Sequence, residues 1–557
     1  MSYSLKFISL LGLSPLTSAL CPLYGQSFPA PTKLTSSGTV KDAFATLTNV
    51  FTNALEAGNS SYGASNPAAV TAFQVFSLDD EKPIFEFYHD GTTLANSLGV
   101  KTVDGNSIFR MGSVGKVLTV YLFLAEVGDS YWNVPITNVI PELRNRTKWE
   151  ENPIDFVQWD AVTLGALAGQ TAGITRDSVG LLPRFWQAAP ELFGMPYLKD
   201  EELEAGTIDP VEGYNCDRQT FFASLYRRQP VFFSNSQPSY SNTGFQLLGY
   251  ALENITGKKI IDLFLKPTNI SQGIIPFNTT LADWDRDFGD AAAMGGFFSS
   301  LNDLSQLGRS ILNSTLLTEN ITWGWLKPTP FTSDPRGAVG RPWEIFRVDT
   351  IPNRSIIDVF GKGGSIGLYQ TWFGVIPNYN VGISSVVAGG GTPTWMNSLF
   401  VEIVVPVLEA TAREQANAAY AGTYTATNGL NSSLTLITEP DLPGLGVKQW
   451  ISNGTDFLTT LSTVIGTPLN TEFLRLFPTN VNRKTGNGTE IVWRAVPNAD
   501  APGSRGPSAA RNSWFGLDGP IHGDFSFDSI LFKLDAQGKA KSVSPRAFRI
   551  ELTKDGQ

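Results

Sequence analysis

The segment 114–126 constrains the fold of this chain most, because its apolar side chains cover nearly every face of a helix. These side chains are Val117, Leu118, Val120, Leu122, Phe123 and Leu124. A helix without a polar face is stable only when other elements cover it on all sides. We therefore expect this helix at the centre of a domain, with Ser113 at its start.

The elements on either side of this helix predict an α+β/α fold. They are an amphipathic helix over 41–56, strands over 69–78 and 83–88, two strands between 369 and 387, and a helix from 393 to about 418. The early strands, over 69–88, and the late strands, between 369 and 387, then form one antiparallel sheet that is flanked by the terminal helices. An all-helical subdomain is inserted between them, and Ser300 with Asp303 predicts a capping box at the start of a helix.

A separate small all-β domain is expected over 421–557. Its short β-type runs lie at 422–424, 473–477, 491–495, 530–534 and 547–552, separated by Gly, Pro and Asn. This pattern is typical of a sandwich or a barrel. Because 557 residues are too many for one ordinary core, we assign 20–420 to the large domain and 1–19 to a signal peptide.

The composition argues against a nucleic-acid partner. Hydrophobic residues make up 42% and charged residues 17%, with a net charge of −10. Binding to phosphates needs a concentrated excess of Lys and Arg, and the sequence contains no basic stripe. We expect a globular protein that binds no nucleic acid, and its oligomeric state stays open.

The N-terminal residues predict secretion. Lys6 precedes a mostly apolar run over 7–20, and Thr17, Ser18 and Ala19 offer a cleavage site. A membrane anchor is the alternative, but Pro15 interrupts a run that is already short for a span. After cleavage we expect no association with a membrane. Glycosylation sequons agree with this route: Asn59, Asn145, Asn254, Asn269, Asn278, Asn313, Asn320, Asn353, Asn431, Asn453 and Asn487.

Two cysteines and two histidines limit the redox and metal chemistry. In an oxidising compartment Cys21 and Cys216 are expected to form one disulfide, and two unrelated thiols are the alternative. His89 and His522 lie far apart in the sequence, which argues against a structural zinc site. We expect neither a metal nor a cofactor.

Ser113 and Lys116 form a possible nucleophile and base. A serine hydroxyl is a weak nucleophile until another group takes its proton. Residues three apart share one face of a helix, so Lys116 points at Ser113. Burial disfavours the charged form of the lysine and makes a neutral amine base accessible. A capping serine followed by a surface lysine is the alternative, but this helix has hardly any polar face.

Two further motifs accompany the first. Tyr240 and Asn242 lie on a loop just before a predicted helix, where they can face a cleft. Lys362, Gly363, Gly364 and Ser365 lie between two strand-like runs. Small residues there allow close approach of a substrate to the strand edge.

Together the three motifs resemble the Ser-x-x-Lys, Tyr-x-Asn and Lys-Thr/Ser-Gly boxes of class C β-lactamases, DD-peptidases and related esterases. The resemblance covers roughly residues 40–415 and includes the segments 162–174 and 293–300. With its C-terminal β domain, the chain is similar to secreted fungal β-lactamase-like proteins. The resemblance implies a β-lactamase/transpeptidase-like fold and hydrolysis of a small-molecule ester, amide or lactam.

The resemblance also implies roles for individual residues. Ser113 would be acylated, Lys116 and Tyr240 would share proton transfer, and Asn242 would contact the substrate. Backbone N–H groups of Ser113 and Ser365 would form the oxyanion hole, with Lys362 adding positive charge beside Tyr240.

The chain departs from the family pattern at two positions. Gly363 stands where the family has a hydroxyl that helps to hold a substrate carboxylate, which puts antibiotic hydrolysis in doubt. Gln170 replaces the usual His, and we interpret it as structural.

Other functions compete with an esterase or amidase. An acyltransferase, a true β-lactamase or a D-aminopeptidase would use the same residues, and a non-catalytic binding protein would use none of their chemistry. The segment 363–367 also matches the nucleophile elbow of α/β-hydrolases, with Ser365 as nucleophile and His522 as base. That elbow requires a helix immediately after the serine, whereas the alternation over 369–376 predicts a strand.

Overall fold

The computed structural model describes residues 25–95, 97–144, 148–177, 190–197, 199, 217–260, 270–351, 355–465, 474–486, 488–497 and 517–556. The chain forms two compact units. The larger comprises Lys33–Val348 and Asp358–Val404, and the smaller combines the segment up to Thr32 with Asp349–Ile357 and Val405–Gln557.

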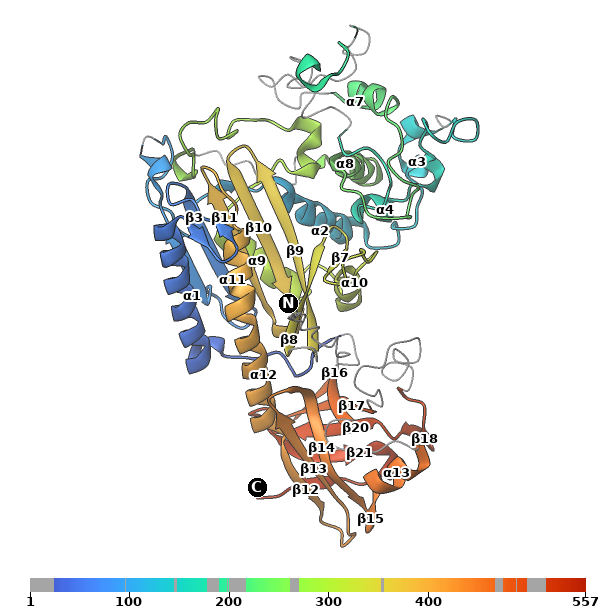
Figure 1. Ribbon diagram of the computed structural model, residues 1–557. Helices are drawn as coiled ribbons and strands as arrows, with labels where there is room; N and C mark the ends of the chain where they lie inside the picture. The colour runs from blue at the N-terminus through green and yellow to red at the C-terminus, as the bar shows by residue number, and fades with distance from the viewer. Residues whose placement is uncertain are drawn as a thin grey trace, which may run out of the picture. The chain divides into compact units, whose positions relative to one another are not determined.

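The larger unit is built on one seven-stranded sheet in the order β4-β3-β11-β10-β9-β8-β7 (Figure 1). Its strands are β3 (Val70–Ser77), β4 (Phe85–His89), β7 (Gly337–Val339), β8 (Glu344–Ile351), β9 (Ser355–Ile366), β10 (Tyr369–Ile376) and β11 (Val381–Ala388). β3 pairs antiparallel with β11, from Val70 opposite Ala388 to Ser77 opposite Val381. Strands from the beginning and from the end of the larger unit therefore pair in one sheet, as predicted.

Helices cover both faces of this sheet because β3 is apolar on both faces. On one face, Phe73 packs against Phe51 of α1 (Gly38–Ala57), and Phe51 packs in turn against Trp395 of α11 (Thr394–Ile403). Figure 1 shows these two terminal helices together over the sheet. On the other face, Phe76 lies against Gly308 of α9 (Leu301–Leu312), where a Cβ atom would come within 2.0 Å of the ring.

The apolar segment forms α2 (Gly115–Val127), and its burial confirms the prediction of a central helix. Eight of its residues are buried, including polar ones: Gly115, Lys116, Val117, Thr119, Val120, Tyr121, Phe123 and Leu124. The helices of the insertion include α4 (Leu164–Ala168), α7 (Arg218–Leu225), α8 (Asn242–Thr256) and α10 (Glu319–Trp325), of which α8 and α10 pack against α2.

The smaller unit contains a closed eight-stranded barrel. Its strands follow the order β13-β12-β22-β21-β20-β17-β16-β14, and a further pairing of β13 with β14 closes the circle. Their bounds are β12 (Gly422–Ala426), β13 (Ser433–Glu439), β14 (Leu442–Ser452), β16 (Leu474–Thr485), β17 (Gly488–Pro497), β20 (Ser529–Leu534), β21 (Ala540–Pro545) and β22 (Leu552–Lys554). Of the two all-β forms that the sequence leaves open, the structure is thus the barrel.

An aromatic cluster fills the barrel from the side of the preceding helix α12 (Val405–Tyr420). The ring of Tyr420 lies 4.8 Å from Trp493 and 5.2 Å from Phe532. Trp493 and Phe532 are fully buried, so the last residue of the helix belongs to the core of the barrel.

The predicted helix over 393–418 is interrupted at Val404, between α11 and α12. By length and composition, Thr394–Tyr420 is the one helical segment of the described chain that is apolar enough to cross a membrane. From the sequence, no association with a membrane is expected after signal cleavage. In Thr394–Tyr420, 56% of the most apolar window is buried inside the protein, as expected for a core helix of a globular domain.

The capping box at the start of α9 generates a stability prediction. Ser300 Oγ accepts from the backbone N–H of Asp303, and the Asp303 carboxylate accepts from the backbone N–H of Ser300. Ser300→Ala should lower the free energy of unfolding of the larger unit by about 1 kcal/mol, because an N–H at the helix end loses its acceptor. Urea denaturation followed by fluorescence measures this. Thr318→Ala is the control, since the Thr318 side chain makes no cap hydrogen bond to α10, and an equal loss there would contradict the assignment.

Candidate active site

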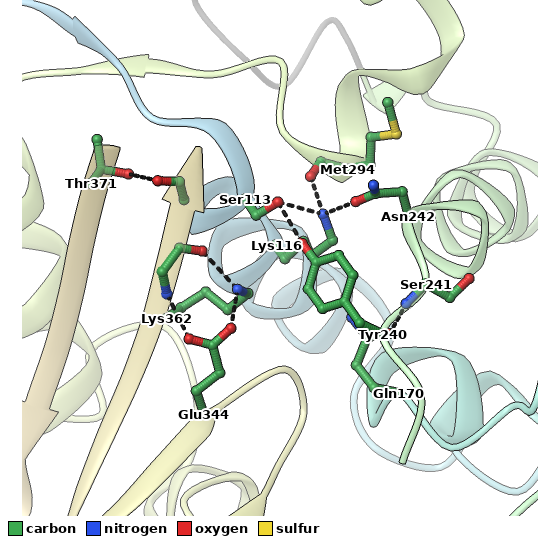
Figure 2. A network of polar contacts seen from close by, with 12 residues as sticks. Ser113, Lys116, Gln170, Tyr240, Ser241, Asn242, Met294, Glu344, Lys362 and Thr371 are labelled. Atoms are coloured by element: carbon green, nitrogen blue, oxygen red, sulfur yellow. Dashed lines mark hydrogen bonds and ion pairs between the residues drawn. The ribbon is translucent and has the colours of Figure 1, made fainter. Parts of the chain in front are cut away.

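The three sequence motifs converge on one site in the larger unit (Figure 2). Ser113 lies in a 3-10 turn (Gly112–Val114) that leads directly into α2, and Lys116 lies in the first turn of that helix. Tyr240 lies just before α8, Asn242 is the first residue of α8, and Lys362 lies in the C-terminal half of β9. Side chains from the helical insertion and from the sheet therefore surround Ser113.

Ser113 receives two hydrogen-bonding partners. Its Oγ lies 3.0 Å from Lys116 Nζ, and the Tyr240 hydroxyl donates to it at 2.5 Å. A hydroxyl can accept one hydrogen bond while it gives its own proton to another group. Ser113 is therefore placed to lose its proton to the lysine while the tyrosine hydroxyl stays beside its oxygen.

Lys116 is fully buried, and this burial is the main cause that holds its pKa well below the ordinary lysine value. The ammonium of Lys362 lowers the pKa of Lys116 further. Lys116 Nζ lies 2.7 Å from Asn242 Oδ1 and also contacts the carbonyl oxygen of Met294. A neutral amine has two N–H donors and one lone pair. With both donors directed to these oxygens, the lone pair faces Ser113.

Tyr240 is held in the protonated form. Burial is the main cause that raises its pKa to about 12, and the hydrogen bond with Ser113 opposes this shift. Two cations lie near the tyrosine ring, Lys362 Nζ at 5.2 Å and Arg176 Cζ at 5.1 Å from its centroid, and the Lys116 amine nitrogen lies 5.1 Å from it. Cations near an aromatic face are attracted by its quadrupole, which helps to fix the ring beside Ser113.

Asp177, which the sequence analysis does not single out, orients the amide of Asn242. Asn242 Nδ2 donates to Asp177 Oδ1 at 2.8 Å, which leaves Asn242 Oδ1 to accept from Lys116. The backbone N–H of Asn242 donates to the carbonyl oxygen of Arg176 at 2.8 Å. Asp177 therefore acts on the lysine through Asn242.

Gln170 holds the backbone of the loop that carries Tyr240. Its Oε1 accepts from the N–H of Ser241 at 2.6 Å, and its carbonyl oxygen accepts from the N–H of Ser239 at 2.7 Å. Gln170 itself adopts a left-handed backbone with φ of 58°. These contacts agree with the structural interpretation of this position.

Glycine lets the end of β9 lie against the turn before Ser113. A Cβ atom on Gly364 would come within 2.1 Å of the Met111 carbonyl oxygen and 2.9 Å of the Val114 nitrogen. A Cβ atom on Gly112, which has φ of 51°, would come within 2.8 Å of the Ser365 nitrogen. The backbone of Ser365 thus lies beside the residue before Ser113, and an oxyanion hole formed by the N–H groups of Ser113 and Ser365 stays a prediction.

The nucleophile-elbow interpretation of Ser365 is wrong. β9 continues through Ser365 to Ile366 and pairs with β10, so a strand follows the serine where the elbow needs a helix. The Ser365 hydroxyl accepts from Gln370 Nε2 at 2.6 Å. His522 belongs to the smaller unit, in β18 (Ile521–His522).

Glu344 is a second residue that the sequence analysis misses. It is the first residue of β8, and its carboxylate bridges two groups at the end of β9. Glu344 Oε1 pairs with Lys362 Nζ, and Glu344 Oε2 accepts from the N–H of Gly363 at 2.9 Å. Burial lowers the pKa of Lys362, and the carboxylate of Glu344 opposes that shift.

Several predicted sites lie outside the described residues: the signal segment 1–19, Cys21, Cys216, Asn145, Asn269, Asn353 and Asn487. The seven other sequon asparagines are all exposed: Asn59, Asn254, Asn278, Asn313, Asn320, Asn431 and Asn453. Within the described ranges, no three His, Cys, Asp or Glu side chains gather in a way that could hold a metal ion.

Known proteins resemble the chain along nearly its whole length. The family model "Beta-lactamase" matches residues 84–396, and the model "Beta-lactamase-like-like, C-terminal domain" matches 412–556. A "Beta-lactamase-like protein" of Arthroderma benhamiae is 30% identical over 93% of both chains. A "Probable hydrolase M10" of a Phoma species is 27% identical over 98% of this chain and 93% of its own.

Solved structures give a weaker likeness. The octameric penicillin-binding protein homologue of Pyrococcus abyssi covers 92% of this chain and 99% of its own, with 14% identity and a TM-score of 0.46. At the level of the family, the sequence matches support a serine hydrolase.

The geometry predicts how pH controls the reactivity of Ser113. Because the pKa of Lys116 is well below its ordinary value, the neutral amine should accept the serine proton at neutral pH. The rate at which a serine-directed phosphonate labels Ser113 should therefore fall as pH drops through this lowered pKa. Rate constants measured across pH, with peptide mass spectrometry to locate the label, provide the test. Lys116→Arg should label slowly at every pH, and a rate that rises only near the ordinary lysine pKa would contradict a neutral Lys116.

Proposed function

The chain belongs to the Beta-lactamase family, and on that premise we propose that it is a secreted serine hydrolase of small-molecule esters or amides. The observation that carries the proposal is the position of Ser113 Oγ, 3.0 Å from a buried amine and 2.5 Å from a protonated phenol. This is a nucleophile with a base on one side and an acid on the other.

Acylation follows from these contacts. The Ser113 proton passes to the Lys116 lone pair as the serine oxygen attacks the substrate carbonyl carbon. Backbone N–H groups of Ser113 and Ser365 stabilise the oxyanion that forms. When the tetrahedral intermediate collapses, the bond to the leaving group breaks, and the Tyr240 hydroxyl protonates the departing alkoxide or amine. The Lys116 ammonium then returns a proton to Tyr240, and an acyl-enzyme remains.

Deacylation repeats the sequence with water as nucleophile. Water loses a proton to the Lys116–Tyr240 pair, attacks the acyl carbonyl, and releases the carboxylic acid with Ser113 reprotonated. An acyltransferase would use the same residues with an alcohol or amine in place of water. A non-catalytic binding protein would not need the hydrogen bonds of Ser113 to Lys116 and to Tyr240, and both hydrogen bonds are present.

Secretion is part of this proposal. The apolar run after Lys6 and the small residues up to Ala19 support it. The exposure of all seven described sequon asparagines supports it further, since glycans attach only to accessible side chains. We also propose that Cys21 and Cys216 form a disulfide in the mature protein.

The nucleophile and base should be indispensable as a unit. Ser113→Ala and Lys116→Ala should each lower kcat/KM for nitrophenyl butyrate by about a thousandfold or more, and the double variant should be no worse than either. His89→Ala and His522→Ala are the controls, and they should retain most activity because this mechanism uses no histidine. Labelling of Ser365 in place of Ser113 by a phosphonate would overturn the assignment of the nucleophile.

Short-chain activated esters should be better substrates than cephalosporins. Gly363 lacks the hydroxyl that would hold the carboxylate of a lactam, and a hydrogen bond to a charged group is worth about 1.5–3 kcal/mol. The loss corresponds to roughly one to two orders of magnitude in specificity. The measurement is the ratio of kcat/KM for nitrophenyl butyrate to that for a chromogenic cephalosporin. A ratio well below one would identify a true β-lactamase.

A further inference from the structure

The two donors at the end of β9 are already occupied by a side chain of the protein. Lys362 Nζ is paired with Glu344 Oε1 and also donates to the Gly363 carbonyl oxygen at 2.7 Å. The N–H of Gly363 donates to Glu344 Oε2 at 2.9 Å. Each oxygen of one carboxylate thus takes one donor, an ammonium and a backbone amide.

The position of Gly363 depends on the same carboxylate. A Cβ atom built on Gly363 would lie 3.3 Å from Glu344 Oε2, closer than most side chains tolerate. A threonine or serine there would therefore press against the carboxylate. The Glu344 carboxylate therefore lies against the side of the backbone where a side chain at position 363 would begin.

The Glu344 side chain is open to solvent beside the site. Its side chain is 40% exposed, whereas that of Lys362 is 2% exposed. Lys362 lies 5.2 Å from the ring centre of Tyr240, whose hydroxyl contacts Ser113. Figure 2 shows the carboxylate beside Lys362 on the sheet side of the nucleophile. A substrate bound at Ser113 therefore meets a negative charge at this edge.

We propose that Glu344 is a specificity-determining residue that serves as an internal carboxylate in the anion-binding position of the cleft. It excludes substrates that carry a carboxylate on the leaving group and admits neutral or cationic ones. A substrate carboxylate would have to displace Glu344 from both donors and would be repelled until it did so. A neutral amide or an ammonium at the same place meets no such repulsion. This inference rests on the proposed function and names its substrate class.

The test uses a matched pair of esters, 4-carbamoylphenyl butyrate and 4-carboxyphenyl butyrate, which differ mainly in the charge of the leaving group. Wild-type protein should prefer the carbamoyl ester. Glu344→Gln removes the charge and keeps one acceptor oxygen, which can serve either Lys362 or the N–H of Gly363. It should reduce that preference by about tenfold to a hundredfold, the range expected for a charged hydrogen bond. Comparing variant with wild type for each ester cancels the intrinsic reactivity of the two leaving groups.

Glu126→Gln is the matched control, because it makes the same charge change at the far end of α2, where Glu126 pairs with Lys258 at 2.6 Å. Its ester preference should equal that of the wild type. A preference that Glu344→Gln leaves unchanged, with the carbamoyl ester still hydrolysed, would overturn the inference.

A binding measurement keeps the inference testable without turnover. Calorimetry on Ser113→Ala should show tighter binding of 4-acetamidobenzamide than of 4-acetamidobenzoate, and tighter binding of the benzoate would overturn the inference. Absence of Ser113-dependent turnover of any ester, with this binding preference intact, would overturn only the proposed function.

Discussion

The site depends on the burial of one amine. Lys116 lies in the first turn of a helix with hardly any polar face, and that burial is the largest cause of its lowered pKa. A solvated lysine three residues after Ser113 would stay protonated at neutral pH and offer no lone pair. The apolar surroundings of α2 thus do two things at once, because they assemble the core of the larger unit and convert an ammonium into a base.

Much of this could be predicted from the sequence because the signals are local. The burial of α2 follows from its apolar side chains alone, and the capping box at Ser300 from a spacing of three residues. The pairing of β3 with β11 in one sheet could be inferred because the sequence predicts strands both near the beginning and near the end of the larger domain. The barrel could only be narrowed to two all-β forms, since closure depends on the pairing of β13 with β14, which no single strand encodes.

The two site residues that could not be predicted from the sequence form hydrogen bonds with residues far away in the chain. Asp177 contacts Asn242 from 65 positions away, and Glu344 contacts Gly363 from 19 positions away. Each is a single acidic residue without a periodic pattern around it, so nothing local distinguishes it from a surface charge. The sequence alone shows only that Gly363 lacks a hydroxyl group. The structure adds that a carboxylate from the neighbouring strand lies beside this glycine.

This carboxylate also links the edge of the sheet to the nucleophile through charge. Glu344 favours the charged form of Lys362, and the Lys362 ammonium lowers the pKa of Lys116. Glu344 acts on Lys116 directly in the opposite direction, but more weakly than Lys362 does. The net effect of the ion pair is therefore to lower the pKa of Lys116 while the charge on Lys362 stays compensated. Selection against anionic substrates and activation of Ser113 then depend on the same ion pair.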